Sequence, residues 1–97
     1  MTRRVAAIAD RLRIIRIAYG RAQGFEKECR KAQFARLCGL TPQAWNNAES
    51  GQNQIGIQSA VQICCMTGVT LDYIFRGNSS ALPYSLAVQI AKLKAES

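Results

Sequence analysis

Apolar residues recur with the period of an α-helix along most of the chain. In the first segment they are spaced three and four residues apart, at Val5, Ile8, Leu12, Ile15 and Tyr19. This spacing stacks them on one helical face and predicts a first amphipathic helix. We expect Gly20 to end that helix, because glycine readily adopts the left-handed conformation found after a helix C-terminus.

A second helix is predicted over residues 25–38, which are rich in Glu, Lys, Arg and Ala. We expect this helix to end just before Gly39. Only Gly39 and Leu40 stand between this helix and the next signal, Thr41. Two short helices joined by such a glycine-containing turn form a helix-turn-helix.

The third helix has clear signals at both of its ends. Thr41 can cap it through the side-chain hydroxyl, and Pro42 suits the first helical position, where the missing N–H costs nothing. Gly51 closes the helix after about nine residues. The core-facing positions of this segment are Leu40, Trp45 and Ala48.

Three more helices follow, and no stretch shows the alternation of a β-strand. The fourth is indicated by the apolar spacing of Ile57, Ala60, Val61 and Cys64, and we expect Gly68 to end it. Thr70 can cap a fifth helix over residues 71–76, which Gly77 stops. Pro83 opens a last helix with one apolar side, formed by Leu82, Leu86, Ile90 and Leu93. The pattern predicts an all-α fold.

We divide the chain into a head of residues 1–77 and a helical extension of residues 78–97. The extension packs on the head or lies at a dimer interface. Ile14 and Ile17 lie off the main apolar stripe of the first helix. They are either scattered exposed residues or the contact for the last helix, in the same chain or across a dimer; we favour packing within the chain.

Positive charge is concentrated at the start of the chain. The 97 residues carry a formal charge of +7, and residues 1–36 contain ten Lys and Arg against three Asp and Glu. The remaining 61 residues are neutral in sum. A basic arm of this kind, with Arg3 and Arg4, suits phosphate contact without sequence readout. The alternative is a solvated face that only keeps the protein in solution.

Composition argues against catalysis and against a metal centre. There is no histidine, the commonest general base and metal ligand. The four cysteines, which contain no C-x-x-C pair, are Cys29, Cys38, Cys64 and Cys65. We interpret them as structural thiols, with metal binding or a redox switch at Cys64–Cys65 as the alternatives. We predict no enzyme activity, no cofactor and no metal.

The targeting signals of exported or membrane proteins are not apparent in the sequence. No apolar segment with a small-residue cleavage site follows Met1. The longest stretch without charge, residues 50–71, carries several Gln and Asn side chains and does not suit a transmembrane helix. We therefore expect a cytoplasmic protein that does not bind membranes.

Amide side chains occupy the outward face of the third helix. Gln43, Asn46, Asn47 and Ser50 follow a helical spacing of three, four and seven. Asn or Gln can pair with adenine in the major groove, and each good pair discriminates by about 1–3 kcal/mol. Thr41, at the helix N-terminus, can bind a phosphate or a base edge. The alternative is that these residues are simply exposed polar side chains.

These residues resemble a known family. The run FARLCGLTPQAWNNAESG, residues 34–51, resembles the helix-turn-helix of the phage repressor/Cro (XRE) family, and GVTLDYIFRG, residues 68–77, is similar to that family's closing segment. The resemblance covers residues 12–77. It implies a five-helix lambda-repressor-like domain, here with an additional C-terminal helix. It also implies a transcriptional regulator, usually dimeric, on a palindromic operator.

The resemblance also implies roles for individual residues. It places Pro42, Gln43 and Asn47 at the base-reading positions, with Thr41 beside them, and we add Asn46 from the amide face. It further implies a buried ion pair between Arg16 and Glu49. Removing one partner of such a pair typically costs about 3–5 kcal/mol.

The chain departs from the family pattern in three places. The connection between the first two helices is longer, and its extra residues either lengthen the second helix or form a loop. Lys31 stands where the family has glutamine, and a lysine can hold a phosphate. The loop after the third helix carries Gln52 and Asn53 in place of basic residues, so phosphate contacts there must come from amide and backbone donors.

We therefore expect sequence-specific binding of double-stranded DNA by a homodimeric regulator, acting as a repressor at an operator. The alternative is an antitoxin-type interaction module that also binds DNA and has a further protein partner. The short C-terminal helix is the only candidate segment for such a partner.

Overall fold

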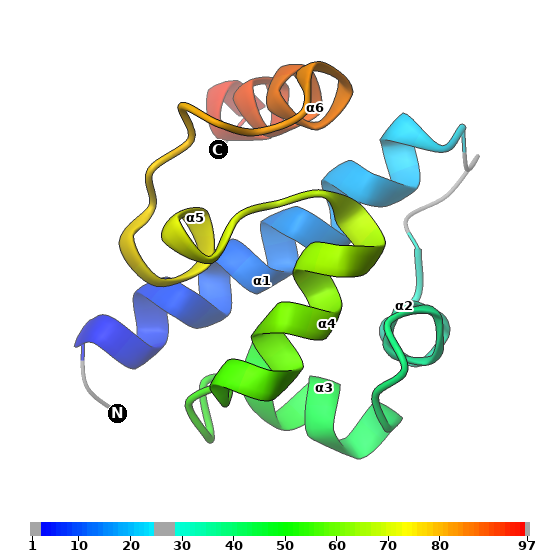
Figure 1. The fold of residues 1–97 in the computed structure, drawn as a ribbon, viewed down its shortest axis with the longest axis vertical. Coiled ribbons are helices and arrows are strands. Elements are labelled where there is room, and N and C mark those ends of the chain that lie inside the picture. The colour runs from blue at the N-terminus through cyan, green and yellow to red at the C-terminus, as the bar shows by residue number, and fades with distance from the viewer. Residues whose placement is uncertain (1–2, 25–28, 97) are drawn as a thin grey trace.

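The computed structural model describes residues 3–24 and 29–96, with the side chains of Arg3 and Arg4 excepted. Within these ranges the chain forms six helices and no strand (Figure 1). The helices are α1 (Arg3–Ala22), α2 (Lys31–Leu37), α3 (Pro42–Glu49), α4 (Ile57–Thr67), α5 (Leu71–Arg76) and α6 (Tyr84–Glu96). The all-α prediction is confirmed at this level.

Helix α1 organises the molecule, because α3, α5 and α6 all pack against it. Its predicted apolar stripe is the centre of the core, where Leu12 and Ile15 are fully buried. Aromatic rings from α2 and α3 complete this region. The centroids of Phe34 and Trp45 lie 4.8 Å apart, and those of Phe34 and Tyr19 lie 5.8 Å apart.

Most predicted helix ends agree with the structure. The side-chain oxygens of Thr41 and Thr70 accept hydrogen bonds from the backbone N–H groups of Ala44 and Tyr73, at 3.1 and 3.0 Å. The glycines that follow four of the helices have positive φ, as helix-ending residues do: Gly39, Gly51, Gly68 and Gly77.

The predicted end of the first helix is wrong. Helix α1 runs through Gly20 to Ala22, and the glycine with positive φ that follows this helix is Gly24. Gly20 is needed for a different reason, since the chain at Cys29 lies directly against it. A Cβ atom at Gly20 would lie 3.1 Å from both the Cβ and the backbone nitrogen of Cys29.

The second helix is shorter than its composition suggested. It spans only Lys31–Leu37, and Cys29 and Arg30 before it are not helical. Arg30 has extended backbone angles at the N-cap. The part of the prediction at residues 25–28 lies outside the described residues. The additional residues at positions 29 and 30 therefore belong to the connection.

Helix α4 presents to the core only part of the face that its apolar spacing indicated, because Ala60 is buried and Cys64 half-buried while the other two predicted positions are exposed. Ala60, Ile63 and Thr67 point inward, whereas Ile57 is 62% exposed and Val61 is also exposed. Thr67 tolerates burial because its hydroxyl donates to the carbonyl oxygen of Ile63 at 2.8 Å and accepts from the N–H of Val69 at 3.2 Å.

Helix α6 covers the side of α1 that the main stripe leaves open. Ile14 and Ile17 of α1 are buried, as are Leu86 and Ile90 of α6. The favoured packing of the two isoleucines within the chain therefore agrees with the structure. Among the described residues, no helix is both long and apolar enough to span a bilayer.

Candidate functional site

Helices α2 and α3 are joined by a tight turn that sets their relative orientation. The N–H of Leu40 donates to the carbonyl oxygen of Ala35 at 2.8 Å, and Gly39 supplies the left-handed backbone that this turn requires, with φ of 77°. Helix α3 then starts at Pro42, capped by Thr41. The turn at Gly39 and the cap at Thr41 both depend on residues close in sequence. The helix-turn-helix arrangement of α2 and α3 therefore follows from the sequence between Cys38 and Thr41.

One face of α3 anchors the helix and the other is open to solvent. Trp45, Ala48 and Glu49 are buried, which orients the helix on α1 and α2. The predicted readout residues lie on the open face: Thr41, Pro42, Gln43 and Asn46 are exposed, and Asn47 is half-buried. The structure therefore brings these five residues together on one surface.

The loop after α3 is attached to the same helix. The backbone carbonyl oxygen of Asn47 accepts hydrogen bonds from the N–H groups of Gln52 and Asn53, at 3.0 and 3.2 Å. The side chains of Gln52 and Asn53 are exposed. These two predicted phosphate residues thus lie beside the solvent-exposed face of α3.

The surface between α3 and the start of α4 is concave. Its volume is about 360 Å³, and its polar lining includes Thr41, Gln43, Asn47, Asn53 and Ser59. All five of these groups are amides or hydroxyls, which both donate and accept hydrogen bonds. The groove therefore offers neutral hydrogen-bonding groups and carries no side-chain charge.

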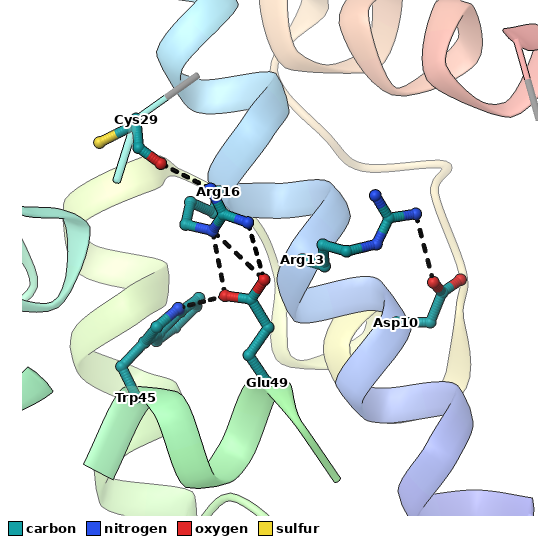
Figure 2. A network of polar contacts seen from close by, with 6 residues as sticks. All are labelled: Asp10, Arg13, Arg16, Cys29, Trp45 and Glu49. Atoms are coloured by element: carbon teal, nitrogen blue, oxygen red, sulfur yellow. Dashed lines mark hydrogen bonds and ion pairs between the residues drawn. The ribbon is translucent and has the colours of Figure 1, made fainter. Parts of the chain in front are cut away.

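A buried polar network fixes the end of α3 to α1 (Figure 2). Arg16 of α1 and Glu49 of α3 form an ion pair, with 2.8 Å between Nη2 and Oε1 and 3.0 Å between Nε and Oε2. Both residues are buried, at 7% and 9% exposure. This geometry is the bidentate arrangement in which an arginine recognises a carboxylate most strongly.

Two further groups complete the network, and sequence reasoning missed both. The indole N–H of Trp45 donates to Glu49, and Arg16 Nη1 donates to the backbone carbonyl oxygen of Cys29 at 2.6 Å. The position of Trp45 one turn before Glu49 was a usable signal for the first contact. The second is a backbone contact from the long connection, and no side-chain pattern indicates it.

The structure divides the basic residues of the first third into two groups. Several are engaged within the fold: Arg16 with Glu49, Arg21 with Glu96 at 2.8 Å, and Arg11 with the carbonyl oxygen of Ile74 at 3.1 Å. The exposed cations of α2 and its N-cap are Arg30, Lys31 and Arg36, and the exposed Arg13 of α1 lines a hollow with Glu49 and Ser50 at the end of α3. The side chains of Arg3 and Arg4 lie outside the described residues. The site therefore has a basic flank at α2 and a neutral face at α3.

The thiols are not arranged as a reactive centre. Burial raises the pKa of Cys38 to about 12, and burial likewise raises the pKa of Cys29, although the nearby Arg16 lowers it. Such thiols stay protonated and unreactive near neutral pH. Of the two adjacent cysteines, Cys64 is half-buried and Cys65 is exposed. No group of three possible metal ligands occurs in the described ranges.

No protein-family model, curated protein or solved structure matches this chain.

Proposed function

We propose that this protein binds double-stranded DNA in a sequence-dependent manner, as a homodimeric transcriptional repressor. In this proposal α2 and α3 act as a lambda-repressor-like helix-turn-helix of the phage repressor/Cro (XRE) type. Helix α3 enters the major groove, where Gln43, Asn46 and Asn47 read bases, with Thr41 and Pro42 at the groove edge. The observation that carries the proposal is the exposed, uncharged amide face on a short helix held rigidly by its opposite face.

The separation of charge from readout supports the same proposal. Arg30, Lys31 and Arg36 are exposed around α2, while α3 itself has no basic residue. Contacts to phosphates supply affinity without sequence information, and contacts to base edges supply specificity. In this arrangement the basic residues around α2 would contact phosphates, and the neutral amide face of α3 would contact bases. We assign phosphate contact to Lys31 and to the donors at Gln52 and Asn53, with Arg3 and Arg4 as further candidates.

The size of the molecule is compatible with two copies on neighbouring turns of DNA. The folded chain measures 28 × 25 × 24 Å. Half-sites read by helix-turn-helix dimers are about 34 Å apart. Two copies of this size fit side by side on one face of the duplex at that spacing without overlapping. Sedimentation of the complex on a selected duplex would give two chains per duplex if the dimer proposal is right.

The decisive experiment begins with selection of duplexes from a random pool, followed by competition binding of the selected and a scrambled duplex. Gln43→Ala and Asn47→Ala are expected to reduce the preference for the selected duplex by about tenfold each, since a good amide–base pair discriminates by about 1–3 kcal/mol. Gln23→Ala is the matched control, because Gln23 is an exposed amide that follows the last residue of α1 and belongs neither to α3 nor to the loop after it. An unchanged preference in both α3 variants would refute the readout assignment.

A second arm tests the phosphate role by salt dependence. Lys31→Gln should weaken binding to all duplexes alike and reduce the salt slope of log K by about 1. Lys92→Gln is its control, an exposed lysine on α6. If affinity hardly changes between low and physiological salt, the basic flank does not contact phosphates. If selection enriches no sequence at all, a protein-interaction module becomes the better description.

A further inference from the structure

A second cavity lies on the side of the molecule built by α1, α5 and α6, and no residue of α3 lines it. Its volume is about 320 Å³. Three cationic side chains reach it from three different helices, namely Arg11, Arg76 and Lys94, against a single carboxylate, Asp10. The lining thus has an excess of positive charge, and the volume is at the low end of the range for small-molecule sites, about 300–1,000 Å³.

Tyr73 provides an independent sign that this cavity is built for a ligand. The residue lines the cavity and is 1% exposed, yet its hydroxyl has no hydrogen-bond partner among the described residues. A buried polar group without a partner costs about 1–3 kcal/mol. Burial raises the pKa of Tyr73 above its ordinary value, so the hydroxyl keeps its proton and can donate it in a hydrogen bond.

Arg11 is held in place at the cavity by the end of α5. Its Nη1 donates to the carbonyl oxygen of Ile74 at 3.1 Å, and its guanidinium lies against Gly77. Gly77 has φ of +80°, and a Cβ atom there would lie 3.0 Å from Arg11 Nη2. The guanidinium has five N–H donors, so one bond to a carbonyl leaves others for an anion.

The two remaining cations are on the rim. Arg76 has a side chain that is 79% exposed and pairs with Asp72 at 3.4 Å, a distance that makes a weak surface contact. Lys94 is exposed on α6. Long side chains of this kind can turn toward a bound anion. The apolar part of the lining, Ala7 and Ile14, comes from α1.

We propose that this cavity binds a small organic anion, with a carboxylate or phosphate group between Arg11, Lys94 and the hydroxyl of Tyr73, and an apolar part against Ala7 and Ile14. Arg76 adds charge at the rim. The concave shape and the buried hydroxyl favour a small molecule over the backbone of a duplex, which needs an accessible surface. Because the ligand would join α1, α5 and α6, its binding stabilises the folded chain.

Calorimetric titration of the full chain with phenyl phosphate, inorganic phosphate and sodium chloride at equal ionic strength tests the proposal without any DNA. We expect saturable binding of the two phosphates, with phenyl phosphate the tighter, and none of chloride. Lys94→Gln should weaken phenyl phosphate binding by about tenfold, which is the loss of one charge-assisted hydrogen bond. Lys92→Gln, two residues away on the same helix and outside the cavity, should bind like wild type.

Tyr73→Phe separates ligand binding from a purely structural role. Because it removes an unpaired buried hydroxyl, the ligand-free variant should unfold at the same temperature as wild type or higher, while its phenyl phosphate affinity falls several-fold. Tyr84→Phe is the control, at an 84% exposed tyrosine. Absence of saturable phosphate binding, or equal losses in Lys92→Gln and Lys94→Gln, would overturn the proposal. It is also wrong if Lys94→Gln lowers only the affinity for duplex DNA.

Discussion

Glu49 is at the centre of a buried network that joins α1, α3 and the connection before α2. Its carboxylate accepts from Arg16 of α1 and from the indole of Trp45, and Arg16 in turn reaches the backbone at Cys29. The open face of α3 is therefore positioned by a charge pair on the opposite face. Charges buried in this way are tolerated only when every partner is present.

We predict that Arg16→Met lowers the free energy of unfolding by about 3–5 kcal/mol, because it leaves the Glu49 carboxylate buried beside a single N–H donor. Urea unfolding followed by fluorescence measures this, and Trp45 is the only tryptophan in the chain. Arg13→Met is the control on the same helix; its pair with Asp10 is exposed, and we expect a loss within about 1 kcal/mol. Equal losses in the two variants would contradict a dominant role for the buried pair.

Cys38 gives the protein a sensitivity to alkaline pH. Burial raises the pKa of its thiol from 9.0 to about 12. Above pH 9 the unfolded chain therefore loses this proton while the folded chain keeps it, so stability falls as pH rises from 9 toward 12. Cys38→Ala should lose less stability than wild type between pH 8 and 10.5, as measured by urea unfolding at each pH. Parallel pH curves for the two proteins would refute this assignment.

At the scale of single helices, caps were the reliable part of sequence reasoning. Thr41 with Pro42 marks the start of α3, and Gly68 and Gly77 mark the ends of α4 and α5; each acts within a few residues of its own position. Gly20 shows the limit of such reasoning. Gly20 lies against Cys29, nine residues later in the chain, and this contact depends on the path of the connection between the two helices. Glycine therefore ends a helix at some positions of this protein, whereas at Gly20 it allows close packing within a helix.

The exposed face of α4 could not be read from its sequence for a related reason. The helix has apolar residues on more than one side, so helical spacing alone does not say which side is buried. Ala60 and Ile63 face the core, and Thr67 joins them because its hydroxyl finds two local partners. The solvent-exposed amide face of α3 was predictable because the apolar residues Trp45 and Ala48 mark the opposite side as the buried one.

Thr41 and Thr70 allow capping to be separated from the proposed DNA contact. Each accepts one backbone hydrogen bond at the start of its helix. Replacement of either by alanine should cost about 1 kcal/mol of stability in thermal or urea unfolding. Only Thr41→Ala should also weaken binding to the selected duplex, since Thr70 lies outside the proposed interface. Equal DNA affinity in the two variants would remove Thr41 from the readout set.

At the scale of the whole molecule, three helices pack on different sides of α1, and each of them also contacts one of its arginines. Arg16 pairs with Glu49 of α3, Arg11 donates to the carbonyl oxygen of Ile74 in α5, and Arg21 pairs with Glu96 of α6. The net charge of +7 thus overstated the cations free for a polyanion, because charge counting cannot tell a structural arginine from a solvated one. Only the three-dimensional contacts make that distinction.

The sequence left open whether helix α6 packs on its own chain or across a dimer, and its contribution to stability can be measured. Ile90 is buried against the side of α1 that carries Ile14 and Ile17. Ile90→Ala should lower the free energy of unfolding by about 2–5 kcal/mol, from lost apolar contact and the cavity left behind. The control is Lys92→Ala on the exposed side of the same helix, with an expected change within about 0.5 kcal/mol. Because α6 and α3 lie at opposite sides of the molecule (Figure 1), Ile90→Ala should keep its preference for the selected duplex under conditions where it remains folded. A loss of stability no larger than that of the control would mean that α6 does not dock on α1 in solution.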